Sequence, residues 1–505
     1  MSTLSDVLEK GRSVPHHAPW QRAIVDAVTW TSAISALSEG RLILLGLWGE
    51  ASAVHMALLD EPTRAIGVLS LEELEEGGYP SVAQLHPPAL RLERALRDLT
   101  GLDPRDLPDS RPWLDHGCWD LRHPLGERGI ALPEAGPYAF LPAEGDSLHQ
   151  IAVGPVHAGI IEPGHFRFAA NGETVVRLEE RLGYVHKGIE ALMEGADPIR
   201  GSQLAGRVSG DSTVAYAYAF SCAVEAALGI VVPPRAIWLR ALMAELERLA
   251  NHLGDIGAIC NDAAFPLMLA HCGALRERVL RAADAAFGHR LMRDRIAPGG
   301  VTRDLNGGGA AGLRSLLLEI RHRFPALVEL YDNTASLQDR TVGTGRLRAE
   351  LARAYGAGGY VGRASGRGFD ARHVLLYPPY DHLVFGVPVL NDGDVNARVW
   401  IRIREVDESL LLIEQILDRL PIGSILNAIP SVGERREGMA LVEGFRGDVL
   451  VWLRLAPEGV VERCHLRDPS WFQWPLIEAA IEGNIVADFP LCNKSFNCSY
   501  SGHDL

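Results

Sequence analysis

The chain of 505 residues has little cysteine and no excess of positive charge. Its 7 cysteines are a sparse and odd set, which argues against a disulfide-stapled fold and favours a reducing compartment. Asp and Glu (64) outnumber Lys and Arg (49), so the formal net charge is −15. A protein that binds nucleic acid non-specifically needs clustered cations to release counterions, and this composition argues against that class.

Long hydrophobic runs are also missing. The segment from Met1 to His17 carries several charges and no apolar core, so no secretory signal is expected. The stretch most similar to a membrane span, 214–232, is interrupted by Glu225 and followed by two prolines. Because a carboxylate in the middle of a bilayer is costly, we predict a buried helix there rather than a membrane span.

Common nucleotide-binding and hydrolase motifs are absent as well. The glycine cluster at 356–362 lacks the spacing of a dinucleotide-binding loop, since Val361 stands at the third glycine position and a helical pattern precedes it. No Walker loop, H-E-x-x-H or G-x-S-x-G sequence occurs. Five cysteines stand singly and are predicted to be small buried hydrophobic residues: Cys118, Cys222, Cys260, Cys272 and Cys464.

The chain does contain two compositional regimes. Short apolar runs between 41 and 70 and a helical stretch at 87–102 predict a small α/β unit, followed by a Pro- and Gly-rich linker at 104–142. Beyond it, strands flanking Asn171-Gly172 predict a hairpin, and helical patterns occupy 235–253, 313–337 and 406–420. We predict an α+β fold, with a small α/β domain and linker at 1–142 and a mainly helical domain with short C-terminal strands at 143–505.

Three segments carry an ordered set of motifs: 154–167 continuing to GYVHKGIE at 183–190, RVSGDS at 207–212 continuing to Glu225 and then 235–253, and the C-terminus at 492–505. With matches at 363–370 and 443–447, they resemble the large subunit of membrane-bound group 4 [NiFe]-hydrogenases of the formate hydrogenlyase and hydrogenase-4 type. That family is homologous to the 49 kDa subunit of respiratory complex I. The stretches 92–102 and 120–125 are similar to the 30 kDa subunit of complex I, fused ahead of the large subunit.

The chain departs from this family where the metal would bind. A [NiFe] centre needs four thiolates from two C-x-x-C pairs, because soft sulfur ligands hold these metals. By the resemblance, the first pair falls at Ser209 and Ser212 and the second at Ser499 and Gly502, so hydroxyls or hydrogen replace all four thiols. Cys498 lies one position away but cannot replace a four-thiolate cage. We therefore expect no nickel centre in this chain.

The quinone pocket of complex I is matched only in part. The resemblance places His186 at the position of the histidine that holds the quinone headgroup, whereas the tyrosine position falls on Gly210. Because histidine titrates near neutral pH, His186 is predicted to be catalytic. Asp211 is predicted to accompany it, as a hydrogen-bond partner or a proton carrier, and a solvated aspartate at the start of a helix is the alternative.

Three further residues map to the cavity by resemblance. Arg363 and Asp504 are expected on its wall. Glu190 corresponds to a carboxylate that can bind magnesium in hydrogenases. Without a metal cluster, a buried salt bridge to Arg207 or Arg363 is the interpretation we favour for Glu190.

The resemblance implies a subunit of a membrane-bound, complex I-like oxidoreductase that couples electron transfer, with quinone as an acceptor, to ion translocation. No cofactor is assigned to this chain. A [4Fe-4S] cluster is expected in a small iron–sulfur partner, and quinone-channel and antiporter-like partners are expected in the membrane. NAD binding is linked to the wider family. The chain is expected at the cytoplasmic face of the cell membrane, peripheral to it. A non-catalytic scaffold is the alternative, and an active formate hydrogenlyase-type hydrogenase is a third hypothesis.

Overall fold

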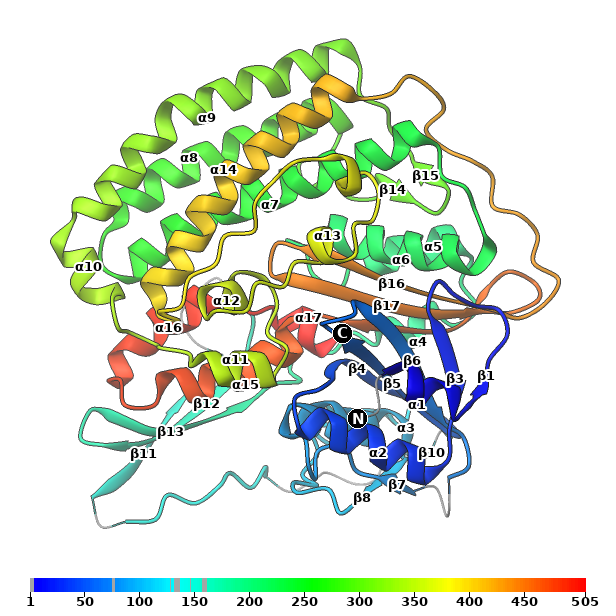
Figure 1. The fold of residues 1–505 in the computed structure, drawn as a ribbon. Helices are drawn as coiled ribbons and strands as arrows, with labels where there is room; N and C mark the ends of the chain where they lie inside the picture. The colour runs from blue at the N-terminus through cyan, green and yellow to red at the C-terminus, as the bar shows by residue number, and fades with distance from the viewer. Residues whose placement is uncertain (1–3, 75–77, 128, 131–136, 146, 157–160) are drawn as a thin grey trace.

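The computed structural model describes residues 4–74, 78–127, 129–130, 137–145, 147–156 and 161–505. Figure 1 shows a blue N-terminal unit, a layer of green and yellow helices, and orange strands and red helices of the C-terminal part between them. The described residues form an α+β protein, as the sequence predicts. Within these ranges, no helix is both long enough and apolar enough to cross a membrane.

The N-terminal unit is built on a five-stranded sheet. Its order is β1 (Arg12–Ser13), β3 (Gln21–Ile24), β6 (Ala65–Leu71), β5 (Ala53–Asp60) and β4 (Ile43–Glu50). Alternate side chains of β4 enter different apolar clusters, so the predicted apolar runs are strands buried on both faces. The unit also contains α1 (Leu4–Glu9), α2 (Ala27–Ser38), α3 (Leu90–Thr100) after a 3₁₀ turn (Pro87–Ala89), and the ladders β7 (Gly78–Pro80)–β8 (Asp103–Arg105) and β9 (Leu121–Arg122)–β10 (Gly129–Ile130).

The predicted hairpin is confirmed. β12 (His165–Asn171) and β13 (Thr174–Arg181) pair antiparallel, and β11 (Leu148–Val153) adds a third strand beside β12. Asn171 pairs with Thr174, so Gly172 and Glu173 form the turn. Gly172 has a φ of 58°, a left-handed conformation that glycine adopts without strain.

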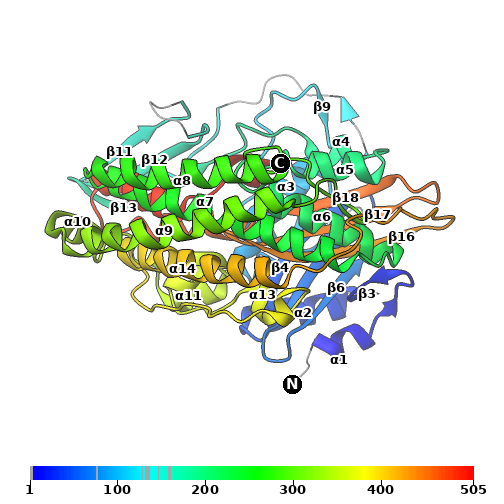
Figure 2. The ribbon, with the colours of Figure 1, turned by 90° about the horizontal axis from the view of Figure 1, so that it is seen from above.

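Helices of different lengths form a layer over the C-terminal sheet (Figure 2). They are α5 (Pro198–Ala205), α6 (Thr213–Leu228), α7 (Pro234–Asp262), α8 (Pro266–Phe287), α9 (Gly307–Asn333), α10 (Ala335–Thr341) and α14 (Val395–Arg419). α7 packs against α8 and α14, and α6 is buried along most of its length, as predicted for 214–232. α14 begins eleven residues earlier than the predicted 406, because its first turns contain buried Arg398 and Arg402, which interrupt the apolar pattern.

Short helices α11 (Ala349–Ala354), α12 (Gly359–Ala364) and α13 (Ala371–Val374) surround the glycine cluster at 356–362. Gly359 has a φ of 59°, and a Cβ there would clash with the main-chain oxygen of Arg446. The cluster therefore allows two backbone segments to approach closely. Its glycine at 359 fixes the position of the turn that carries Arg446.

The C-terminal sheet has the order β18 (Val461–Arg467), β17 (Gly447–Leu455), β16 (Arg436–Gly444) and β2 (His17–Ala18). α4 (Ile189–Met193) packs on β18, the small ladder β14 (Ile296–Ala297)–β15 (Gly300–Val301) packs on α6, and the chain ends in α15 (Ser470–Ile481), α16 (Phe489–Phe496) and α17 (Tyr500–Asp504). Because β2 comes from the N-terminal unit, and Arg22 pairs with Glu437 at 2.9 Å, contacts join both sides of residue 142. The domain boundary stays a prediction.

The single cysteines differ in their burial. Cys260, Cys272 and Cys464 are buried, as predicted, but Cys118 is exposed and Cys222 is only partly buried. Cys118 lies in an irregular segment between β8 and β9 with no apolar cover, so the prediction is wrong there.

Candidate functional site

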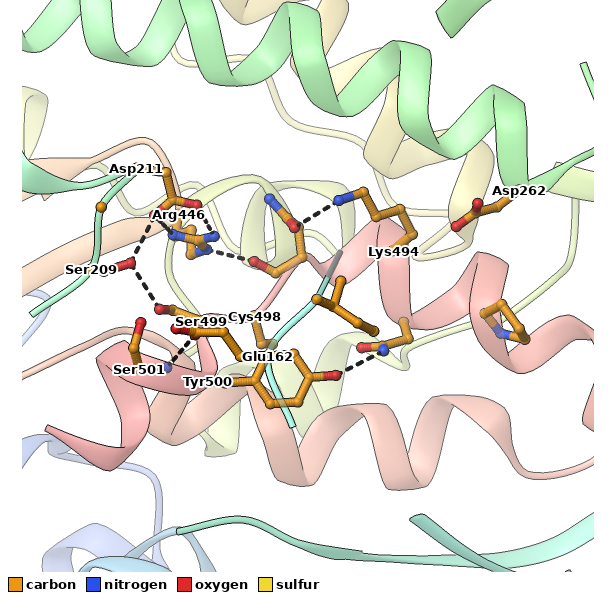
Figure 3. Close-up of a pocket in the computed structure, with 15 residues that line it drawn as sticks. Glu162, Ser209, Asp211, Asp262, Arg446, Lys494, Cys498, Ser499, Tyr500 and Ser501 are labelled. Atoms are coloured by element: carbon orange, nitrogen blue, oxygen red, sulfur yellow. Dashed lines mark hydrogen bonds and ion pairs between the residues drawn. The ribbon is translucent and has the colours of Figure 1, made fainter. Parts of the chain in front are cut away.

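A polar pocket of about 380 Å³ opens between the loop before α6 and the C-terminal segment (Figure 3). Four of the predicted site residues line it: Ser209, Gly210 and Asp211 on the loop, and Ser499 before α17. Arg446 reaches it from the β16–β17 turn. The remaining lining residues are Ile161, Glu162, Asp262, Pro490, Asn493, Lys494, Asn497, Cys498, Tyr500 and Ser501.

Hydrogen bonds connect the two sides of this pocket (dashed lines in Figure 3). The Arg446 guanidinium donates to both carboxylate oxygens of Asp211, at 2.7 and 2.5 Å. The Ser209 hydroxyl donates to Asp211 at 2.7 Å, and the Ser499 hydroxyl lies 2.9 Å from Ser209 Oγ. Because the Ser209 hydroxyl proton points at the Asp211 carboxylate, the Ser499 hydroxyl donates the hydrogen bond between the two serines. We call Ser209, Asp211, Arg446 and Ser499 the polar staple.

The charges of the staple stabilise each other. Burial alone would raise the pKa of Asp211, but Arg446 and the Ser209 hydroxyl favour the carboxylate and lower its pKa to about 2. The Asp211 side chain is 35% exposed and that of Arg446 is 5% exposed. Asp211 is therefore ionised at neutral pH, and its hydrogen bonds go to Arg446, Ser209 and Ser212 rather than to His186.

Gly502 lies where no side chain has room. Ser499 Oγ accepts a hydrogen bond from the Gly502 N–H at 2.8 Å and so caps α17. A Cβ at Gly502 would clash with Asp468 Oδ2, which accepts the hydroxyl proton of Tyr216 at 2.6 Å. The carboxylate of Asp468 thus lies beside Gly502, the last of the four positions that the resemblance aligns with thiolate ligands.

The residues at these four positions do not fit a [NiFe] centre. The hydroxyls of Ser209 and Ser499 are hard oxygen donors that are committed to the staple, and Gly502 offers no side-chain donor. Ser212 Oγ accepts from Arg446 at 3.2 Å. In the part of the chain that the structure describes, no group of three or more His, Cys, Asp or Glu side chains is arranged to hold a metal ion.

The close approach at Gly502 has a measurable consequence. We expect Gly502→Ala to destabilise the chain by about 1–3 kcal/mol, because the added methyl group overpacks the contact with Asp468. Urea denaturation of the full chain measures the loss. Gly210→Ala is the matched control, since a Cβ there meets nothing within 4 Å, and it should change stability by less than about 0.5 kcal/mol. Equal losses in the two variants would contradict the close approach.

His186 and Asp504 lie outside the pocket lining, where the C-terminus docks. The Asp504 carboxylate accepts from the N–H groups of Gly183 (2.9 Å) and Val185 (3.0 Å). The His186 ring stacks on Trp119 with centroids 4.8 Å apart, and its Nδ1 lies 2.6 Å from the Asp504 main-chain oxygen. Because a carbonyl only accepts, Nδ1 carries the proton and Nε2 is the basic nitrogen.

Glu190 makes a buried salt bridge, but with partners other than Arg207 or Arg363. Its carboxylate accepts from Arg463 at 2.8 Å and from His465 at 2.9 Å. Burial would raise the pKa of Glu190, and these two partners outweigh that effect and lower it to about 2. The carboxylate is thus engaged by the Arg463 cation and by hydrogen bonds from His465 and the Leu466 N–H.

Arg363 and Ser212 also lie outside the pocket lining. The fully buried Arg363 side chain pairs with Glu405 at 2.7 Å and with Glu443 at 2.9 Å. Ser212 is at the N-cap position of α6 without a side-chain capping bond. The sequence-derived set of residues is therefore divided between an open pocket and the packed structure around it.

Several residues that line the pocket are not predicted by the sequence, among them the charged residues Arg446, Lys494 and Glu162. Arg446 lies in the matched stretch 443–447, so a signal for it is present. Glu162 and Lys494 lie in the motif segments 154–167 and 492–505, but the sequence does not single out either side chain, and the fold brings the two segments together.

Comparison with known families adds two matches. Residues 187–254 match the family described as nickel-dependent hydrogenase, and residues 263–435 match the 49 Kd subunit of respiratory-chain NADH dehydrogenase. The first match covers the segment that follows His186, the loop with Ser209 and helix α6; the second covers α8 to α14. Fold and matches define the class as large subunits of hydrogenases and of complex I.

Individual relatives cover from two thirds to nearly the whole of the chain. Formate hydrogenlyase subunit 5 of Escherichia coli (strain K12) is 33% identical over 488 residues, covering 94% of this chain and 84% of the relative. An NADH-quinone oxidoreductase subunit of Roseiflexus sp. (strain RS-1) is 32% identical, covering 67% of this chain and 94% of the relative. A chain in the solved structure of the membrane-bound sulfane sulfur reductase, an archaeal respiratory membrane complex, is 26% identical with a TM-score of 0.67, covering 71% of this chain and 99% of that one. The chain belongs to the family of complex I 49 kDa-like subunits and group 4 [NiFe]-hydrogenase large subunits.

Proposed function

We propose that this chain is the peripheral large subunit of a membrane-bound, complex I-like complex that couples electron transfer to ion translocation, and that it works without a [NiFe] centre of its own. The polar staple carries the proposal. At positions where the family has thiolates, Ser209 and Ser499 donate hydrogen bonds instead, in a network that ends at the Asp211–Arg446 ion pair.

The relatives support the proposed setting. One is named as a subunit of formate hydrogenlyase, one as a subunit of an NADH-quinone oxidoreductase, and one belongs to a respiratory membrane complex. We place the chain at the cytoplasmic face of the membrane. A small iron–sulfur subunit would direct its [4Fe-4S] cluster toward Ser209 and Ser499, and quinone-channel and antiporter-like subunits would lie in the membrane.

The open pocket is the proposed acceptor site, with quinone as the acceptor. A quinone carbonyl accepts hydrogen bonds, and the pocket offers the ammonium group of Lys494 and the side-chain amide of Asn493 as donors. His186 would exchange protons through Nε2. Its segment is tied to the pocket loop, because Lys187 Nζ donates to the Val208 oxygen at 2.8 Å.

One observation favours a second candidate, the non-catalytic scaffold. The staple joins the loop before α6, the β16–β17 turn and the C-terminal segment, so hydrogen bonds hold these parts together without a metal. A chain retained only to keep iron–sulfur and membrane subunits in place would need no more than this.

A His186→Ala variant separates the two candidates. If His186 transfers protons, turnover of the assembled complex should fall about 10²-fold, the low end of the range for general acid–base catalysis. The measurement is electron transfer by the purified complex, with subunit composition checked in parallel. His149→Ala, an exposed histidine of β11, is the matched control and should retain full turnover. Unchanged turnover in an intact His186→Ala complex would favour the scaffold.

A further inference from the structure

A second group of ionisable residues lies where the N-terminal unit, the hairpin and the C-terminal helices meet. Arg91 of α3 donates to Glu180 of β13 at 3.0 Å and to Glu478 of α15 at 2.6 Å. Glu478 Oε1 also accepts the main-chain N–H of Glu180 at 2.8 Å. Trp113 covers the guanidinium at 4.7 Å. One cation thus serves two carboxyl groups in a largely water-free setting.

The charge balance of this trio requires a proton. The side chain of Glu180 is 0% exposed and that of Arg91 is 9% exposed. Glu180 Oε1 is buried and has no hydrogen-bond donor among the described residues. A second, uncompensated carboxylate at such a place costs several kcal/mol, so the group binds a proton instead. Burial and the charge of Glu478 raise the pKa of Glu180 well above its usual range, and burial raises that of Glu478.

We infer that Glu180 and Glu478 hold one proton between them at neutral pH and form a proton-binding site that no sequence motif indicates. Glu478 is 25% exposed and gives the site access to water, whereas Glu180 faces the interior. The proton belongs to the pair, because two strongly interacting carboxyls titrate as a unit.

The site is electrostatically linked to the polar pocket. Besides burial, the charge of Glu180 contributes to raising the pKa of Cys498 and of Tyr500, both of which line the pocket. Such coupling is reciprocal, so a negative charge that arrives in the pocket increases the proton affinity of the carboxyl pair. Water at Glu478 supplies that proton. Other titratable groups that act on the trio or feel its charge include Glu179, Tyr355, Cys492 and His503. Arg94 and Arg181 lie over the same Trp113 ring as Arg91.

Infrared difference spectroscopy of the full chain in its assembled complex tests the inference. Wild type should show a protonated-carboxyl carbonyl stretch at neutral pH that is missing from both Glu180→Gln and Glu478→Gln. Either substitution leaves a single carboxylate opposite Arg91, which ionises. Glu173→Gln, at the exposed hairpin turn, is the control and should retain the signal. Protonated Glu247, whose pKa burial raises to about 8, contributes equally to all spectra and cancels in the differences.

The two single variants make the outcome decisive. Each variant removes only one glutamate of the pair. Loss of the carboxylic-acid signal in both variants therefore supports one proton that the two glutamates share. Glu478 is the more exposed of the two glutamates, so its substitution is the better tolerated. A carboxylic-acid signal that survives in Glu478→Gln overturns the inference. A wild-type spectrum equal to the spectra of both variants also overturns it. The result does not depend on what binds in the pocket or on whether the chain transfers electrons.

Discussion

Arg363→Ala is expected to destabilise the chain by about 3–5 kcal/mol, the cost of removing one partner from a buried ion pair. The Arg363 side chain is 0% exposed, and it joins α12 to Glu405 on α14 and to Glu443 on β16. Its removal would leave two buried carboxylates without their shared cation. Urea denaturation of the full chain measures the loss, and reduced assembly of the complex should accompany it.

An exposed ion pair provides the control for this prediction. Arg321 and Glu414 lie 2.8 Å apart, but their side chains are 38% and 40% exposed. Arg321→Ala should therefore cost less than about 1 kcal/mol. If both arginine variants lost similar stability, Arg363 would not be the buried anchor that its contacts describe.

Gly210→Trp is expected to abolish turnover of the complex while leaving its assembly intact. Gly210 is exposed in the pocket lining, and a Cβ there meets nothing within 4 Å. The indole therefore fits without clash at its base and would fill much of a pocket of about 380 Å³. An acceptor molecule would then be excluded from the space between Ser209 and Lys494.

The matched control for the pocket is Gly312→Trp. Gly312 on α9 is also exposed, and a Cβ there also meets nothing within 4 Å, but it does not line the pocket. Normal turnover with Gly312→Trp and none with Gly210→Trp would support an acceptor site. Full turnover in both variants would contradict it and favour the scaffold.

Much of the fold follows from local patterns in the sequence. The Asn171-Gly172 pair predicts the hairpin, whose turn residues are Gly172 and Glu173. The apolar runs of β4 to β6 and the helical spacing in α7 also predict elements that the structure contains. The start of α14 is harder to predict, because its buried arginines owe their burial to distant partners: Arg402 pairs with Asp255 on α7. The addition of β2 to the C-terminal sheet likewise depends on tertiary packing rather than on any local signal.

The candidate site could be predicted only in part. Motif positions identify Ser209, Asp211 and Ser499, because the matching stretches around them give their place in the resemblance, although Ser209 and Ser499 stand where that resemblance expects cysteine. The partner of Asp211 could not be predicted, because Arg446 lies 235 positions away and only the sheet turn brings it near. The position of a residue in a motif also does not give the direction of its side chain. His186 and Asp504 lie in motif segments, but they are not part of the pocket lining.

The metal content of the purified, fully assembled complex decides whether this chain works without a nickel centre. Elemental analysis should find iron from the clusters of partner subunits and no stoichiometric nickel, because the polar staple occupies the positions where thiolates would bind it. Stoichiometric nickel, together with dye-linked hydrogen uptake, would contradict the account and identify the complex as a working hydrogenase.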